Sequence, residues 1–211
     1  MPFSLSEIDA YIQALSENAE ALICEASLLL KHGAFARAFT LSHLAREELS
    51  KCLMLQSAGV RTLAGHPIDE KKLLKRLTDH KAKLNSEQVQ NSVWMASIGM
   101  MEQAQDLLKA SSALSGHRNN RKNESLYVGF KNGVVTKPSE NFSKDQASGN
   151  VDLAAIALEQ QKRMTDLMGK FTEREPIVME RIEPGDITIE NMEELFKEMA
   201  VSMRWHYQTP E

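Results

Sequence analysis

The sequence predicts an all-α protein folded as an up-and-down bundle of four to six helices, with one long ordered loop or hairpin insertion. Three features indicate this class. Apolar residues recur at spacings of three and four over long stretches, glycine and proline separate these stretches, and no strand-rich block or internal repeat occurs. A length of 211 residues, 42% hydrophobic and 26% charged, is typical of one globular domain.

The first two expected helices cover residues 6–31 and 34–63. In the first, an apolar stripe that includes Ile8, Ile12 and Leu15 continues to Leu30, and Gly33 marks its end. The second ends where two helix breakers follow closely at positions 65 and 67.

The third and fourth helices are expected over residues 69–84 and from Ser86 to before Gly116. The third opens with acidic residues in its first turn. The fourth opens with Ser-Glu-Gln-Val, a sequence that can cap a helix, and carries apolar residues as far as Leu108.

The segment 116–150 differs in composition: it has many Gly, Asn and Ser residues and no apolar residues at helical spacing. A short turn at Lys131-Asn132-Gly133 lies between LYVGF and VVT. We therefore expect an ordered loop that contains a small hairpin.

Two further helices are expected over residues 151–171 and 189–203, separated by a linker. The predicted organisation is a helical domain of residues 1–175 with the loop 116–150 inserted, and a linker with a C-terminal helix, residues 176–211, packed on the same domain.

Charge and composition argue against several classes of protein. The net charge of -4 and pI near 5.9 argue against a protein that coats nucleic acid through overall positive charge, which leaves only local basic patches. The N-terminus lacks the pattern of a secretory signal, and the longest apolar-leaning run is too short for a membrane span. We expect a cytoplasmic protein with no membrane contact, whose Cys24 and Cys52 are buried thiols on apolar helix faces.

The stretch LAREELSK places two adjacent glutamates in the second helix. With the apolar face centred on Ala45, Glu48 lies about 60° from that face and Glu47 about 160° away. We therefore expect Glu48 to turn inward and Glu47 to face solvent. Lys51, one turn on, is the expected partner in a structural ion pair with Glu48; the alternative is a partly exposed helical pair of small effect.

His80 is the second polar residue expected to face inward, since it shares one side of its helix with Leu73, Leu77 and Leu84. A satisfied core histidine and an acid–base group are both open at this point. No second histidine lies at ligand spacing, and we expect no metal site.

The start of the loop, GHRNNRKNESLYV, gathers Arg118, Arg121, Lys122 and Tyr127. Arginines can clamp a phosphodiester in bidentate fashion, and an aromatic ring can stack on a base, so these residues are candidates for nucleic-acid binding. The alternative is a solvated turn in which one arginine pairs with a buried acid such as Glu48.

LAREELSK, followed by the Asp79-His80-Lys81 segment and by Arg121 leading to SLYVGF, resembles the AbiV family of bacterial abortive infection proteins. This family is a branch of the HEPN superfamily (higher eukaryotes and prokaryotes nucleotide-binding domain). The resemblance implies phage defence, in which gene expression in an infected cell is arrested before progeny phage are released. It also implies a helical homodimer and, as in many HEPN proteins, a metal-independent endoribonuclease without cofactors.

The sequence departs from the catalytic HEPN pattern, an Arg followed after four to six residues by a His that meets its copy across a dimer cleft. Arg118 and Arg121 have no histidine downstream at this spacing, and the literal matches Arg37 to His43 and Arg61 to His66 are short enough to arise by chance. The resemblance thus leaves a modified catalytic site made of Glu48, His80, Arg121 and Tyr127, with His80 as the acid–base group and Arg121 as the phosphate clamp.

Two functions follow for the same residues. In the first, the protein is a dimeric ribonuclease that acts on RNA during infection. In the second, the residues form a buried polar network that fixes the packing, and the protein is a non-catalytic helical binding protein that sequesters a phage or translation-related protein partner.

Overall fold

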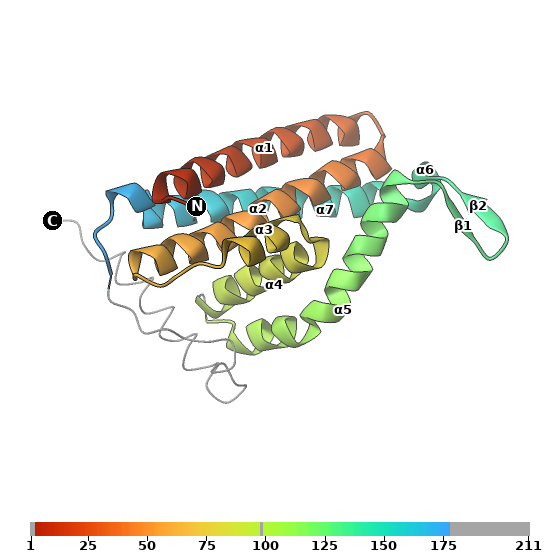
Figure 1. Ribbon diagram of the computed structural model, residues 1–211. Coiled ribbons are helices and arrows are strands. Elements are labelled where there is room, and N and C mark those ends of the chain that lie inside the picture. Colours follow the sequence, from red (N-terminus) through yellow and green to blue (C-terminus); the bar gives the residue numbers. More distant parts are fainter. Residues whose placement is uncertain (1–2, 98, 178–211) are drawn as a thin grey trace.

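The computed structural model describes residues 3–97 and 99–177, and it confirms the predicted all-α bundle (Figure 1). The elements in chain order are α1 (Leu5–Lys31), α2 (Phe35–Leu63), α3 (Glu70–Thr78), α4 (His80–Ser97), α5 (Met101–Leu126), β1 (Gly129–Lys131), β2 (Val134–Thr136), α6 (Pro138–Asn141), α7 (Lys144–Met168) and the 3-10 helix η1 (Phe171–Glu173). The predicted C-terminal helix 189–203 lies outside the described residues.

Helix α2 is the centre of the bundle. It packs along α1 and α7 on one side and along α4 and α5 on the other, and α5 slants away from the bundle toward the β-hairpin (Figure 1). A helix with neighbours on two sides must be buried over most of its circumference, which determines where its polar residues lie.

Local signals explain the ends of the first two helices. Ser4 and Glu7 form a capping box at the start of α1, where the Ser4 hydroxyl accepts a hydrogen bond from the Glu7 backbone N–H. Gly33 and Gly65 follow α1 and α2 with positive φ angles of 76° and 71°, a conformation that glycine adopts without steric cost.

The predicted boundaries of the third and fourth helices are wrong. The chain breaks at Asp79, whose carboxylate accepts a hydrogen bond from the Ala82 backbone N–H and so caps the start of α4. The next break comes at Gly99, with a φ of 89°, so α4 and α5 divide the span that was expected to hold one helix.

The predicted loop 116–150 is also largely helical. Helix α5 continues to Leu126, and its buried residues there, Lys122 and Ser125, are polar, so no apolar stripe marked the helix. Helix α7 starts at Lys144, earlier than expected, behind a capping box formed by Ser143 and Gln146.

The β-hairpin predicted within this segment is present. Strands β1 and β2 pair antiparallel, and the turn consists of Asn132 and Gly133 with φ angles of 51° and 80°. Two successive positive φ angles at an Asn-Gly pair are the signature of the tight turn that suits a twisted hairpin.

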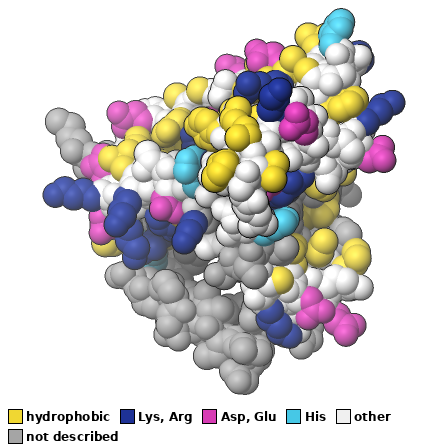
Figure 2. Space-filling model, turned by 90° about the vertical axis from the view of Figure 1, so that its right-hand side faces the viewer, with side chains coloured by type: hydrophobic (Ala, Val, Ile, Leu, Met, Phe, Trp, Pro, Cys, Tyr) yellow, Lys and Arg dark blue, Asp and Glu magenta, His cyan; other side chains and the backbone are white. Residues whose placement is uncertain are grey.

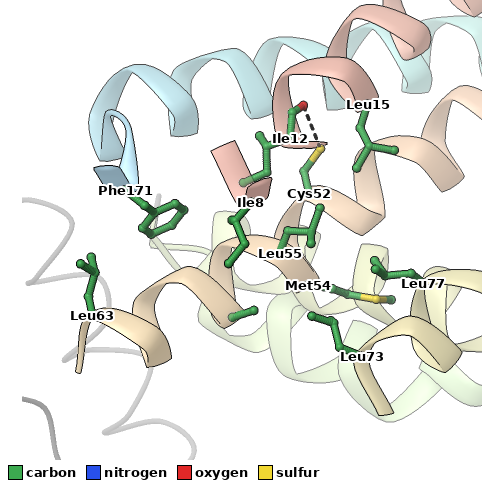
Figure 3. Close-up of a cluster of buried hydrophobic side chains, with 11 residues drawn as sticks. Ile8, Ile12, Leu15, Cys52, Met54, Leu55, Leu63, Leu73, Leu77 and Phe171 are labelled. Carbon is green, nitrogen blue, oxygen red and sulfur yellow. Dashed lines mark hydrogen bonds between the residues drawn. The ribbon is translucent and has the colours of Figure 1, made fainter. Parts of the chain in front are cut away.

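The main hydrophobic core lies at the end of the bundle where α1 begins and α2 ends (Figure 3). Side chains from α1, α2, α3 and η1 meet there, including Ile8, Leu55, Leu77 and Phe171. Cys52 belongs to this core, and burial raises the pKa of its thiol to about 12. Cys24 is exposed, so the expectation of two buried thiols is wrong for this residue.

The contact between α2 and η1 depends on Gly59. A Cβ atom at this position would lie 2.7 Å from the ring of Phe171, which is fully buried. We expect Gly59→Ala to lower the free energy of unfolding by about 1–3 kcal/mol, because the added methyl group would overlap the buried ring and force it to shift. Urea unfolding measures this change. Gly116→Ala in α5 is the control, since its added methyl group meets no atom within 4 Å; a loss of stability equal to that of Gly59→Ala would contradict the steric explanation.

None of the helices in the described ranges combines the length and the apolar character that a membrane crossing requires.

Candidate active site

The buried glutamate of the LAREELSK stretch is Glu47, and the prediction that Glu48 turns inward is wrong. The Glu47 side chain is 2% exposed, whereas that of Glu48 is 20% exposed. Glu48 binds the Lys51 ammonium group through an oxygen at 2.6 Å, so the expected ion pair is present at the edge of the helix.

The error follows from the central position of α2. A helical wheel with one apolar face assumes that the opposite face meets water, but this opposite face packs against α4 and α5. It is a second buried face, and it is polar: its residues are Thr40, His43, Arg46, Glu47 and Ser50.

Two neighbouring helices, α4 and α5, and α2 itself supply the partners of Glu47. The Nζ atoms of Lys83 and Lys122 lie 2.6 and 3.0 Å from its carboxylate oxygens, and Nδ1 of His80 lies 2.9 Å from Oε2. One helical turn before it, Nε2 of His43 lies 3.4 Å from Oε1. A single buried carboxylate therefore joins α2, α4 and α5. We refer to His43, Glu47, His80, Lys83 and Lys122 as the Glu47 cluster.

The cluster keeps Glu47 ionised. Burial by itself would raise the pKa of the Glu47 carboxyl, but its contacts with the His43 imidazole and with the Lys83 and Lys122 ammonium groups outweigh burial and hold the pKa well below its usual range. Burial also lowers the pKa of His43, so this imidazole is neutral at neutral pH.

His80 is the point at which the Glu47 cluster meets solvent. Its side chain is 51% exposed, while Glu47, Lys83 and Lys122 are buried. Nδ1 of His80 also lies 3.0 Å from Nζ of Lys122. Because a carboxylate only accepts and an ammonium only donates, Nδ1 cannot hydrogen-bond to both at once. The Nδ1–H tautomer suits Glu47, leaves Lys122 with Glu47 as its acceptor, and makes Nε2 the basic nitrogen.

A second buried ion cluster lies beside the first on the same helices. Arg46 donates through Nε to Glu87 at 2.7 Å and through Nη1 to Asn150 at 2.7 Å. Nη1 of Arg118 lies 2.7 Å from the other oxygen of Glu87. Arg118, expected to bind nucleic acid, thus pairs with a buried acid, as the alternative interpretation proposed, although the acid is Glu87 rather than Glu48.

Positive charge exceeds negative charge where these clusters meet. The four cations Arg46, Lys83, Arg118 and Lys122 face the two carboxylates of Glu47 and Glu87 among the described residues. Such an excess in a poorly solvated place favours a bound anion at the side that opens to water. In the Glu47 cluster that side is at His80.

The remaining predicted site residues lie outside the Glu47 cluster. Arg121 points to another side of α5 than Lys122: its guanidinium lies 4.2 Å from the ring centroid of Phe142, and its Nη1 lies 2.7 Å from Glu124. Tyr127, at the end of α5, is exposed. Neither makes a contact with His80 in the described part of the chain.

The neutral state of His43 predicts how stability depends on pH. An unfolded histidine has a pKa of about 6.5, so the unfolded chain takes up more protons than the folded one below this pH. The free energy of unfolding is therefore expected to fall between pH 7 and 5. The low pKa of Glu47 adds a second loss that begins only below about pH 4.5. Urea unfolding at a series of pH values measures both.

Two variants test whether His43 causes the fall in the free energy of unfolding between pH 7 and 5. In His43→Gln the free energy of unfolding should change little between pH 7 and 5. In His32→Gln, at the exposed end of α1, it should fall over this range as it does in the wild type. An unchanged slope in His43→Gln would show that another group is responsible.

The chain was compared with protein-family models, curated proteins and solved structures. The model of the HEPN family described as AbiV matches residues 7–159, which include all of the Glu47 cluster. No curated protein and no solved structure matches the chain.

Proposed function

The chain belongs to the AbiV family of HEPN proteins, a family that suggests phage defence by abortive infection, and from this membership we propose that it arrests gene expression in infected cells by cleaving RNA. The proposed catalytic residue is His80. The observation that carries the proposal is the half-exposed imidazole of His80, held through Nδ1 by the buried carboxylate of Glu47.

This arrangement has the geometry of a general base. Glu47 would fix the tautomer and orientation of the ring, as carboxylates do for catalytic histidines, and leave Nε2, on the half-exposed ring, as the nitrogen that can accept a proton. Nε2 would take the proton of an RNA 2′-hydroxyl while the 2′-oxygen bonds to the adjacent phosphorus and the bond from phosphorus to the 5′-oxygen breaks. The products are a 2′,3′-cyclic phosphate and a 5′-hydroxyl.

The leaving 5′-oxygen needs a proton, and the negative charge that develops on the phosphate needs a counterion. We propose that a protonated His80 in the second copy of a homodimer supplies the proton, and that the excess positive charge around Lys122 stabilises the phosphate. The 2′-hydroxyl is the nucleophile and the two His80 side chains transfer the protons, so the proposed scheme includes no metal or other cofactor.

The test is direct. Purified protein is incubated with single-stranded RNA in the presence of a chelator, and the product ends are identified by mass spectrometry. The expected result is cleavage that persists without divalent metal ions and gives cyclic phosphate and 5′-hydroxyl ends. Cleavage that stops in chelator, or products with 5′-phosphate ends, would contradict a mechanism based on His80.

The alternative function, a non-catalytic binding protein, is favoured by a different observation. The β-hairpin and the residues before it expose the large apolar side chains Tyr127, Val128, Phe130, Val134 and Val135, which are 59–75% exposed. Figure 2 looks onto this end of the molecule, where hydrophobic side chains gather at the centre of the view. Such a patch is typical of a protein-binding surface. Capture of a phage or translation protein that depends on Phe130, together with no RNA cleavage, would favour this function.

A further inference from the structure

A groove of about 520 Å³ lies between the C-terminal half of α2, the connection that follows it, and α3. Its floor is apolar, formed by Met54, Ala58, Ile68 and Leu73. It is separate from the Glu47 cluster, none of whose residues line it.

The rim of this groove is basic. Arg61, Lys72 and Arg76 line it, and in the ranges 3–97 and 99–177 none of the three forms an ion pair with a carboxylate. The one acidic residue of the lining, Asp69, accepts a hydrogen bond from the Lys72 backbone N–H and caps α3. Lys71 and Lys75, on the same helix, add to the positive charge. An apolar floor with a basic rim fits an amphipathic segment whose polar side is acidic.

The chain itself contains a segment of this kind. Residues 178–211 include eight acidic and three basic residues, a formal excess of five negative charges in a chain whose net charge is -4. Within 189–203, apolar residues recur at spacings of three and four, and acidic residues lie between them: the apolar ones are Ile189, Met192, Phe196, Met199 and Met203, and the acidic ones are Glu190, Glu193, Glu194 and Glu198.

The described chain also ends beside the groove. The backbone N–H of Ile177 donates a hydrogen bond to the carbonyl of Leu63, the last residue of α2, two residues from Arg61 on the rim. Residues 178–188 can span at most about 40 Å when extended, and α3 is only about 14 Å long, so residue 189 can reach any part of the groove.

From these observations we propose that the groove between α2 and α3 binds the acidic segment 178–211 of the same chain. Burial of its apolar residues on the groove floor stabilises the bound segment. Ion pairs between its glutamates and Arg61, Lys72 and Arg76 determine its orientation in the groove. In this arrangement the acidic side of the segment faces the basic residues of α3. This proposal does not depend on RNA cleavage.

The experiment is zero-length cross-linking of amines to carboxylates in the full-length protein, followed by mass spectrometry of the monomeric fraction. The expected links join Lys71, Lys72 or Lys75 to the glutamates of 190–198. The double variant Lys72→Glu with Arg76→Glu should lose the links of the remaining lysines, and adding Glu193→Lys with Glu194→Lys should restore contact between the two segments.

The control is Lys31→Glu with Lys144→Glu, which changes the net charge equally at exposed positions away from the groove and should leave the links intact. Circular dichroism checks that each variant is folded. Three results would overturn the proposal: no links in the monomer, links only in a covalent dimer, or a groove variant that loses RNA binding while its links stay unchanged. The last result would assign the groove to nucleic acid.

Discussion

Replacement of Glu47 by alanine is expected to lower the free energy of unfolding by about 3–5 kcal/mol, because it leaves Lys83 and Lys122 buried without a carboxylate. The ammonium groups cannot reach water easily, since both side chains are at most 8% exposed. The same change removes the partner that orients His80. Urea unfolding followed by circular dichroism measures the loss.

The adjacent glutamate is the matched control. Glu48→Ala breaks only a pair at the helix edge and should cost about 1 kcal/mol or less. Glu47→Gln keeps the shape but not the charge, and it provides a folded variant if Glu47→Ala does not fold. If Glu48→Ala lowered the free energy of unfolding more than Glu47→Gln did, Glu47 would not be the buried glutamate that holds the three helices together.

The contrast between these two residues shows how far the sequence could predict the site. Apolar periodicity correctly predicted an all-α bundle and the first two helices, since α1 and α2 each present one continuous apolar face. It could not reveal that α2 has a second buried face, because that face consists of polar residues whose partners come from α4 and α5. The only local signal was the spacing of His43 and Glu47, four residues apart.

The same limit explains the error in α5. Arg118, Lys122 and Ser125 recur at spacings of four and three, which is a helical period, but a pattern of apolar residues does not detect it. Their partners, Glu87, Glu47 and Thr40, lie on other helices. Stretches rich in Arg, Asn and Lys that look like loops can therefore be helices when a buried polar cluster is present.

Because His80 lies at the edge of the Glu47 cluster, replacing it should affect the rate of RNA cleavage much more than the stability of the fold. Because its side chain is half exposed, His80→Ala should change the free energy of unfolding by about 1 kcal/mol or less, as surface substitutions usually do. If Nε2 is the general base, the same change should lower the rate of RNA cleavage by a factor on the order of 100 to 10,000. A loss of rate without a loss of stability is what a structural histidine would not produce.

Rates are measured with labelled RNA under single-turnover conditions across pH 5–9. His117→Ala, an exposed histidine on α5, should cleave at the wild-type rate and controls for contamination and for the loss of an imidazole as such. Lys122→Met should also slow cleavage, because it removes positive charge beside Nδ1 of His80. If His80→Ala cleaves RNA as fast as the wild type, the Glu47 cluster is a device for packing three helices, and the exposed hairpin becomes the better place to look for function.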